Sequence, residues 1–346
     1  FTAARKCAVD VTEISPEGYL ELKQDLEAIE LGERRSPQFS SRDEGGANVR
    51  TLYDRRDVHV AAPYCWTVTN TWEREILTYA GKKASAELRY EYNPCVGSID
   101  VVCATVSNRN GRVHSVTARE RNSLDAGWVA SAPRYPAAKR LVVNLPAVEI
   151  GSVIRVTTVQ TVTNAPVAFC GQYSFDSVEP ISVKELNVEC GDLAMKVAWG
   201  GDVGRVIETN RICHAVTNPP ALPREKSQPP SLTWRNCVIM SLADLDESRD
   251  ALWAALAGAR SAGADVAASK ARELVRGAET AEEKVRAIRN WLWRNVRLAG
   301  PDMYSIPFDM AFFPPDRSIS DGYASDADWM NAYYAMLEAV GFDVEY

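Results

Sequence analysis

The chain has 346 residues, of which 46% are hydrophobic and 25% are charged, and its formal net charge is −7. This length predicts about two domains, and the composition is typical of a globular protein. The acidic balance argues against nucleic acid or an anionic membrane as a partner. No apolar run approaches the roughly 18 residues that a membrane span needs.

Residues 1–50 predict an extension ahead of the domains. Ser15-Pro16 is typical of a helix start, and the apolar spacing continues to Ile29. Residues 33–48 are polar and rich in Gly and Ser, which indicates a linker. Because Phe1 is not an initiator Met and no signal peptide is visible, we expect the chain to be processed at its front.

Residues 51–214 predict an antiparallel β-sandwich. Short β-branched or aromatic runs are bounded by turn residues, with no helical segment expected between them. Asn110-Gly111 indicates a hairpin, because both residues tolerate positive φ. The expected strands are Glu87–Tyr92, Ile99–Val106, Val113–Arg119, Arg140–Leu145, Ser152–Val162, Ile181–Val188 and Met195–Trp199.

The cysteines all precede the helical part of the chain, and none forms a C-x-x-C pair, which argues against structural zinc. Their even number permits disulfides and export, although buried thiols are equally consistent with the pattern. No glycine-rich phosphate-binding motif is present, so we expect no cofactor and no metal. The cysteines are Cys7, Cys65, Cys95, Cys103, Cys170, Cys190, Cys213 and Cys237.

Residues 215–240 are rich in proline and predict an extended connector, followed by a mainly helical domain over 241–346. Helices are expected over 244–259, 264–276 and 281–297. Thr280 and Glu283 predict a capping box at the third of these.

The last stretch, residues 320–346, predicts a turn, a helix and a strand. The turn is Asp321-Gly322-Tyr323, and apolar residues then recur at helical spacing from Met330 to Val340. Gly341 is typical of a helix end. Beyond it, Phe342–Tyr346 alternates between apolar and polar residues, as the beginning of a strand does.

This order of turn, helix, Gly and strand resembles the core of the transglutaminase-like superfamily, which shares the papain-type thiol architecture. In that family a G-x-C-x-D motif opens the helix, whose N-terminus lowers the thiol pKa. The family's spacing, counted back from Gly341, places Asp326 at the cysteine, Ala324 at the glycine and Asp328 at the acidic position. The helix over 281–297 resembles the one that precedes the motif in the family.

A second resemblance concerns the strand-rich part. The sequence from Leu145 to Ile154, the long strand after it and Val178–Ile181 resemble the β-sandwich of unknown function that precedes a transglutaminase-like core in bacterial exported proteins. The segment Thr78–Lys83 fits the strand-and-turn pattern of the same family. Together the resemblances imply an α+β fold: an antiparallel β-sandwich followed by a mainly helical, partial transglutaminase-like domain, truncated after its core helix. They also imply a periplasmic or secreted location.

We expect little nucleophilic catalysis at the motif. His59, His114 and His214 all lie in or beside the β region, so no base is expected near Ser325. Position 326 carries a carboxylate instead of the family's thiol, and a carboxylate at a helix start is also an ordinary capping choice. The sequence therefore predicts no catalytic residue.

Aromatic residues surround the motif and would line a peptide or glycan groove, or else form the core under a long loop. Their positions are Tyr304, Phe308, Phe312, Phe313, Tyr323 and Trp329. The predicted remnant of the active site, and the candidate groove, consists of Tyr323, Ser325, Asp326, Asp328 and Trp329.

Three functions follow as hypotheses. The first is an exported, non-catalytic protein that binds or assembles peptide, protein or glycan ligands, in other words a pseudoenzyme. The second is an amide-cleaving or acyl-transferring enzyme with a non-cysteine or externally completed active site. The third is a partner-docking role carried by the sandwich alone.

Overall fold

The computed structural model describes residues 46–200, 206–222 and 235–344. The chain divides into two compact units, Phe1–Ala47 and Asn48–Tyr346, and the description below concerns the second. The helix predicted up to Ile29, almost all of the predicted linker and Cys7 lie outside the described residues. The predicted domain boundaries remain predictions.

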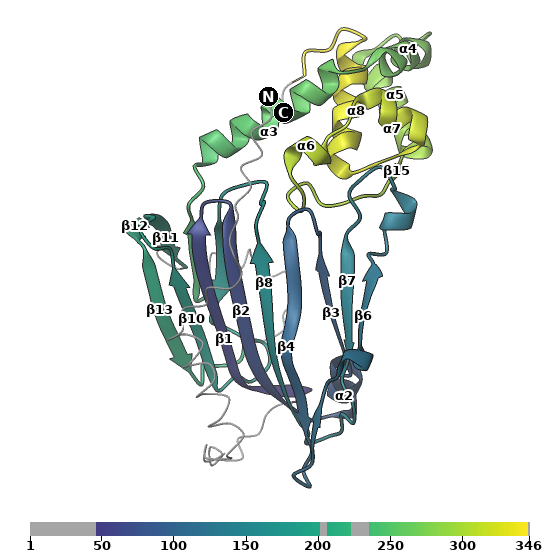
Figure 1. The fold of residues 1–346 in the computed structure, drawn as a ribbon. Helices are drawn as coiled ribbons and strands as arrows, with labels where there is room; N and C mark the ends of the chain where they lie inside the picture. The colour runs from purple at the N-terminus through teal and green to yellow at the C-terminus, as the bar shows by residue number, and fades with distance from the viewer. Residues whose placement is uncertain (1–45, 201–205, 223–234, 345–346) are drawn as a thin grey trace. The chain divides into compact units, whose positions relative to one another are not determined.

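The fold is mixed α+β, and its largest element is a seven-stranded sheet with the order β13-β10-β1-β2-β8-β4-β5 (Figure 1). The hairpin predicted at Asn110-Gly111 joins β4 to β5, where Gly111 has a φ of 80°. The strands are β1 (Val49–Ala62), β2 (Cys65–Ile76), β4 (Gly97–Ser107), β5 (Val113–Ser115), β8 (Val153–Val162), β10 (Val183–Glu189) and β13 (Arg211–Thr217).

The large sheet is not purely antiparallel, which corrects the expectation from sequence. β1 and β10 pair in parallel, with Val58 opposite Val188. The other strand pairs of this sheet are antiparallel. Parallel neighbours need a crossover connection rather than a hairpin, and the chain places eight other strands between β1 and β10.

Two smaller sheets pack on one face of the large sheet. A four-stranded sheet, ordered β12-β11-β14-β9, shares a core with β1, β10 and β13 around Val60, Leu186 and Phe175. A three-stranded sheet, ordered β3-β7-β6, shares a second core with β4 and β8 around Val106 and Ile154. The strands are β3 (Glu87–Tyr92), β6 (Arg121–Asp125), β7 (Lys139–Asn144), β9 (Cys170–Ser174), β11 (Met195–Trp199), β12 (Val206–Thr209) and β14 (Cys237–Ser241).

Side-chain alternation along β2 shows that both cores lie on the same face. Trp66 and Val68 pack with the first core, and Trp72 and Ile76 with the second. These four residues are separated by even numbers of positions, so they point the same way. Asn70 lies between the two pairs on this inner face.

Helices form the part of the chain after β14, as predicted. The capping box of Thr280 and Glu283 is present at the start of α5, and α8 packs against α4, α5 and α7 through a core that includes Ile288, Leu292 and Met336. The elements are α3 (Leu245–Ser261), α4 (Asp265–Leu274), α5 (Ala281–Asn295), β15 (Arg297–Leu298), α6 (Phe308–Ala311), α7 (Pro315–Asp321), β16 (Tyr323–Ala324) and α8 (Asp326–Glu338).

Three local expectations are wrong. The segment from Thr78 is not strand and turn but α2 (Tyr79–Ser85), in which the Thr78 hydroxyl accepts from the Gly81 N–H. Short 3-10 helices, η1 (Ala118–Glu120) and η2 (Val129–Ser131), also interrupt the strand region. Beyond Gly341, residues 342–344 form no strand, although Gly341 ends the helix with a φ of 90° as expected.

Two further features concern the cysteines and the helices. Among the seven cysteines in the described residues, the structure forms no disulfide. None of the helices in the described ranges has the length and apolar character needed to span a bilayer.

Strands β13 and β14 occupy the two ends of the predicted connector 215–240, and its middle lies outside the described residues.

Candidate functional site

The start of α8 is the place where the sequence predicts a vestigial site. The helix begins at Asp326, and the hydroxyl of Ser325 caps it by accepting a 3.2 Å hydrogen bond from the Asp328 N–H. A hydroxyl cap followed by acidic residues in the first turn stabilises the exposed N–H groups and the positive end of the helix. Position 326 therefore stands where a helix would activate a thiol.

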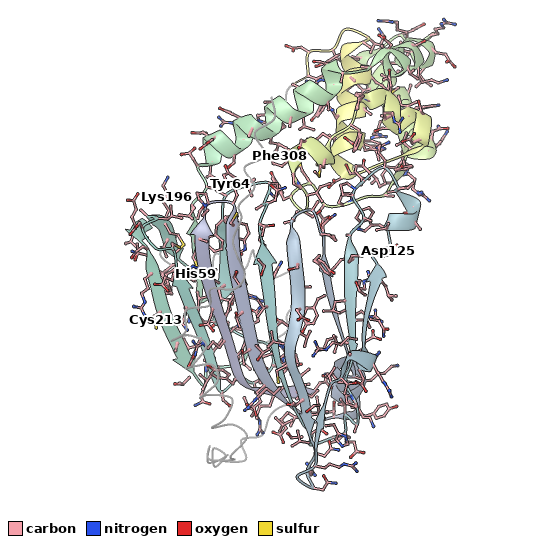
Figure 2. All side chains as sticks on the ribbon, in the orientation of Figure 1. His59, Tyr64, Asp125, Lys196, Cys213 and Phe308 are labelled. Carbon is pink, nitrogen blue, oxygen red and sulfur yellow. The ribbon has the colours of Figure 1, made fainter. Side chains whose placement is uncertain are left out.

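Asp326 is exposed at this position. Its carboxylate accepts a 2.9 Å hydrogen bond from the neighbouring Ala327 N–H. A carboxylate is a much weaker nucleophile toward amides than a thiolate, and attack also needs a base that is oriented on the nucleophile. The three histidines of the chain lie on strands. His59 and Cys213 are labelled on β1 and β13 in Figure 2, and His214 packs edge-on against Phe175 and Trp199.

Cys95 is a residue near α8 that the sequence did not single out. It lies in the turn between β3 and β4 and packs in the same apolar cluster as Phe308 and Ala327. Burial raises the pKa of its thiol, so Cys95 carries less of the reactive thiolate than an exposed cysteine does.

Asp328, two residues along α8, is completely buried and hydrogen-bonded by the protein itself. Its Oδ1 accepts from the Phe313 N–H at 2.9 Å, and its Oδ2 accepts from the Tyr135 hydroxyl at 2.6 Å. Removal from solvent raises the pKa of the Asp328 carboxyl, although these hydrogen bonds and nearby Arg134 act in the opposite direction.

Arg134 holds this region together from the segment 132–138, which runs between η2 and β7. Its side chain is 3% exposed, and its Nη1 donates a 2.7 Å hydrogen bond to Asp321 while its Nη2 lies 3.4 Å from Asp328 Oδ2. The guanidinium carbon lies 4.9 Å from the centre of each of three aromatic rings, those of Tyr135, Phe313 and Tyr323. Aromatic faces stabilise a desolvated guanidinium.

Tyr135 completes the arrangement. Its hydroxyl donates to Asp328 and accepts a 2.8 Å hydrogen bond from the Ser325 N–H, so it bridges the helix cap and the buried carboxylate. Gly300 provides the space, because a Cβ at that residue would lie 2.9 Å from the Tyr135 ring. We name Arg134, Tyr135, Asp321, Tyr323 and Asp328 the clasp.

Burial separates the five residues predicted for the site. Ser325, Asp328 and Trp329 are buried, Tyr323 is half-buried, and Asp326 is exposed. Ser325, Tyr323 and Asp328 all contact the clasp residues of the 132–138 segment. The sequence did not identify Arg134 and Tyr135, because they lie in an irregular segment far from α8 in the chain.

The aromatic residues around α8 mostly contact one another or Arg134. Phe308 stacks on Phe312, which belongs to a buried cluster with Leu252, Leu256 and Ile306. Phe313 packs edge-on against Tyr135. Tyr304 lies tilted against Phe308 with ring centres 6.1 Å apart, but 54% of its surface is exposed. The core interpretation therefore fits Phe312, and a groove along these rings remains a prediction.

Among the described residues, no three His, Cys, Asp or Glu side chains come together as a metal site would require. The donor groups at the start of α8 are directed at protein partners.

The comparison with protein-family models found a match in the strand region. Residues 62–210 match the model of DUF3857, a domain of unknown function with solved structure. The matched segment runs from the end of β1 to the end of β12 and contains Arg134 and Tyr135. No curated protein sequence matches the chain.

One solved structure shares the fold over most of the chain. It is the crystal structure of a putative protease from Parabacteroides distasonis, with a TM-score of 0.68, 15% identity and coverage of 85% of this chain. At this identity the likeness shows the fold alone. The chain spans 59% of the length of that protein.

Two other structures match over shorter parts. An M1 zinc metallopeptidase from Deinococcus radiodurans has a TM-score of 0.27 at 10% identity, covering 56% of this chain and 42% of its own. A CBM3a-L domain from the scaffoldin cipA of Clostridium thermocellum has a TM-score of 0.20 at 11% identity, covering 34% and 73%. Likeness at these scores carries no argument about function.

Proposed function

We propose that this protein combines a sandwich-like strand domain with a transglutaminase-like domain that has lost its nucleophile, and that it binds a peptide or glycan without transferring acyl groups. The observation that carries the proposal is the carboxylate of Asp326, exposed at the first position of α8, where the resembling family has its thiol. Export to the periplasm or cell exterior belongs to the same proposal and rests on the resemblance.

The contacts and burial of Asp328 support the proposed loss of catalysis. A carboxylate that serves catalysis must be able to reach the substrate or its base. Asp328 instead has both oxygens hydrogen-bonded to protein groups and no exposed surface. In this proposal it has a structural role, holding the start of α8 against the 132–138 segment.

The competing function is an enzyme that cleaves or transfers amides. It is favoured by the fold shared with the P. distasonis protein, and it requires a nucleophile other than a cysteine at position 326. Asp326 is the residue whose removal discriminates the two functions.

Turnover of short peptides and of glutamine amides should be measured for the wild type, Asp326→Ala and Asp302→Ala. Asp302 is a matched control because it is also an exposed aspartate, in the loop ahead of α6. We expect no turnover by any of the three. Turnover by the wild type that Asp326→Ala abolishes and Asp302→Ala preserves would overturn the proposal and assign catalysis to this site.

A further inference from the structure

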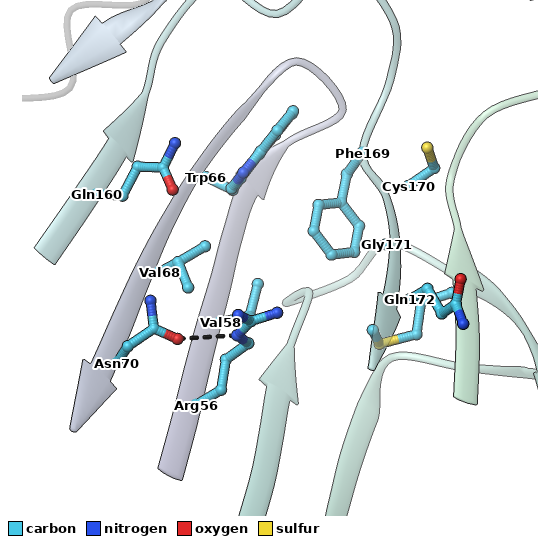
Figure 3. Close-up of a pocket in the computed structure, with 11 residues that line it drawn as sticks. Arg56, Val58, Trp66, Val68, Asn70, Gln160, Phe169, Cys170, Gly171 and Gln172 are labelled. Carbon is cyan, nitrogen blue, oxygen red and sulfur yellow. Dashed lines mark hydrogen bonds between the residues drawn. The ribbon is translucent and has the colours of Figure 1, made fainter. Parts of the chain in front are cut away.

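A cavity of about 170 Å³ opens on the inner face of the seven-stranded sheet, away from α8 (Figure 3). Strands β1, β2 and β8 form one side of it, and β9 and β14 form the other. It lies where the four-stranded sheet ends over the large sheet, beside Asn70. A water molecule occupies about 30 Å³ of liquid, so the space corresponds to roughly five or six waters.

Strand register explains which side chains meet there. Arg56 on β1 is opposite Asn70 on β2, and Val68 on β2 is opposite Gln160 on β8. Residues at alternate positions of a strand point to one face. The same alternation that builds the two cores therefore places a row of polar groups between them.

Arg56 is the charged group of the cavity. Its Nε donates a 2.8 Å hydrogen bond to Asn70 Oδ1, which fixes the plane of the guanidinium, as the dashed line in Figure 3 shows. Within the described ranges Arg56 forms no ion pair, and no carboxylate lines the cavity. The Arg56 guanidinium carbon also lies 5.2 Å from the centre of the Tyr173 ring. A guanidinium held in this way without an ion-pair partner is suited to an anion, and its planar fork matches a carboxylate.

The remaining lining is both polar and apolar. Gln160 on β8 provides an amide donor and acceptor on the inner face, beside the amide of Asn70, whereas Gln172 alternates with buried Tyr173 on β9 and points to the outer face. Trp66 and Phe169 meet edge to face with ring centres 5.3 Å apart, and Val58, Val68 and Met240 extend this apolar surface. Ligand sites commonly combine an apolar wall with a few fixed polar groups in this way.

We propose that this cavity binds the carboxylate end of a small peptide or acylated amino acid. The Arg56 guanidinium donates to the carboxylate, the amide of Gln160 hydrogen-bonds to the adjoining peptide group, and the apolar side chain packs against Trp66 and Phe169. The volume suits about one amino-acid residue. This site does not involve Asp326 and goes beyond the function proposed for the start of α8.

The test uses the whole chain and two probes, N-acetyl-leucine and its neutral amide N-acetyl-leucinamide, with binding followed by calorimetry. Removing the negative charge removes charge-assisted hydrogen bonds to Arg56, which corresponds to at least about tenfold weaker binding. We expect saturable binding of the acid and tenfold or greater weakening for the amide. Absence of saturable binding of the acid up to about 10 mM, a weak limit for a specific ligand, overturns the proposal, and so does equal binding of both probes.

Variants locate the site. Arg56→Met should weaken binding of the acid by at least about tenfold, and Arg56→Lys should weaken it less because the charge remains. Arg55→Met is the matched control, because Arg55 is the next residue of β1, points to the opposite face and pairs with Asp57 at 2.8 Å. Thermal unfolding of each variant verifies that it is folded. Equal loss in Arg55→Met and Arg56→Met would place the ligand elsewhere.

Discussion

The hydroxyl of Tyr135 donates a 2.6 Å hydrogen bond to the carboxylate of Asp328, which lies 193 residues further along the chain. The same hydroxyl accepts from the N–H of Ser325, the residue that caps α8. One phenol therefore connects the segment before β7 to both the cap and the buried acid of the helix. The clasp fixes the position of the helix start on which the proposed function depends.

Replacing Tyr135 by Phe should destabilise the fold. The change keeps the ring and leaves a buried acceptor and a buried N–H without this partner, which typically costs about 1–3 kcal/mol. Tyr79→Phe is the control, because Tyr79 is 71% exposed, and it should change the free energy of unfolding by less than about 0.5 kcal/mol. Urea unfolding of both variants measures the difference, and equal stability of the two would refute the role of the hydroxyl.

Replacing Arg134 by Met should destabilise the fold more strongly. Breaking a buried ion pair from one side leaves an uncompensated charge and typically costs about 3–5 kcal/mol. Arg317 provides a close control, since it pairs with the same Asp321 at 3.6 Å but is 59% exposed. For Arg317→Met we expect less than about 1 kcal/mol. A comparable loss of stability in both variants would show that burying Arg134 among the three aromatic rings adds no stability.

Stability should also depend on pH through Asp328. Burial raises the pKa of this carboxyl above its ordinary value of 3.8, so above pH 3.8 the folded chain retains a proton that the unfolded chain has released. This contribution is fully present below pH 3.8 and is lost as the pH rises through the folded-state pKa. Most paired carboxylates have the opposite dependence.

The measurement compares the free energy of unfolding of the wild type and Asp328→Asn across mildly acidic to neutral pH. Relative to the variant, which has no proton to release, the wild type should lose stability as the pH rises. Asp302→Asn, at an exposed position, serves as the reference for surface effects. A constant difference between wild type and Asp328→Asn, or a gain by the wild type, contradicts the raised pKa.

A thiol introduced at position 326 should be unusually acidic. The N-terminus of a helix lowers the pKa of a thiol below its free value of about 8.5, and position 326 is the first residue of α8. Alkylation of Asp326→Cys by iodoacetamide, resolved by site with mass spectrometry, should therefore proceed at lower pH than alkylation of an ordinary thiol. Exposed Cys213 on β13 is an internal reference, and a midpoint at or above about 8.5 would mean that this helix start does not activate a nucleophile.

Local signals explain what the sequence predicted well. The capping box of Thr280, the hairpin at Asn110-Gly111 and the helix end at Gly341 each depend on residues within a few positions of one another. Such signals are readable because the backbone conformation they favour is a property of the short segment itself. The start of α8 at Asp326 was instead placed by the spacing of the resembling family, counted back from Gly341.

The longest strands were harder to read. In β1 the run Asp54–Asp57 is entirely charged, which is unusual for a strand in the middle of a sheet. Cross-strand partners accommodate these charges: Arg56 donates to Asn70 on β2, and Asp57 accepts from Asn187 on β10. No pattern within β1 itself indicates that those partners exist.

The sequence by itself determined the α+β composition, the order of strands before helices, and the carboxylate at the start of α8, because each follows from local propensity and residue identity. Only the tertiary structure decided that β1 and β10 run in parallel, that a polar row lies between the two cores, and that Arg134 and Tyr135 hold Asp328. The physical reason is that these features depend on contacts between residues far apart in the chain, whose free energy arises from burial and pairing once the sheets and helices have packed together.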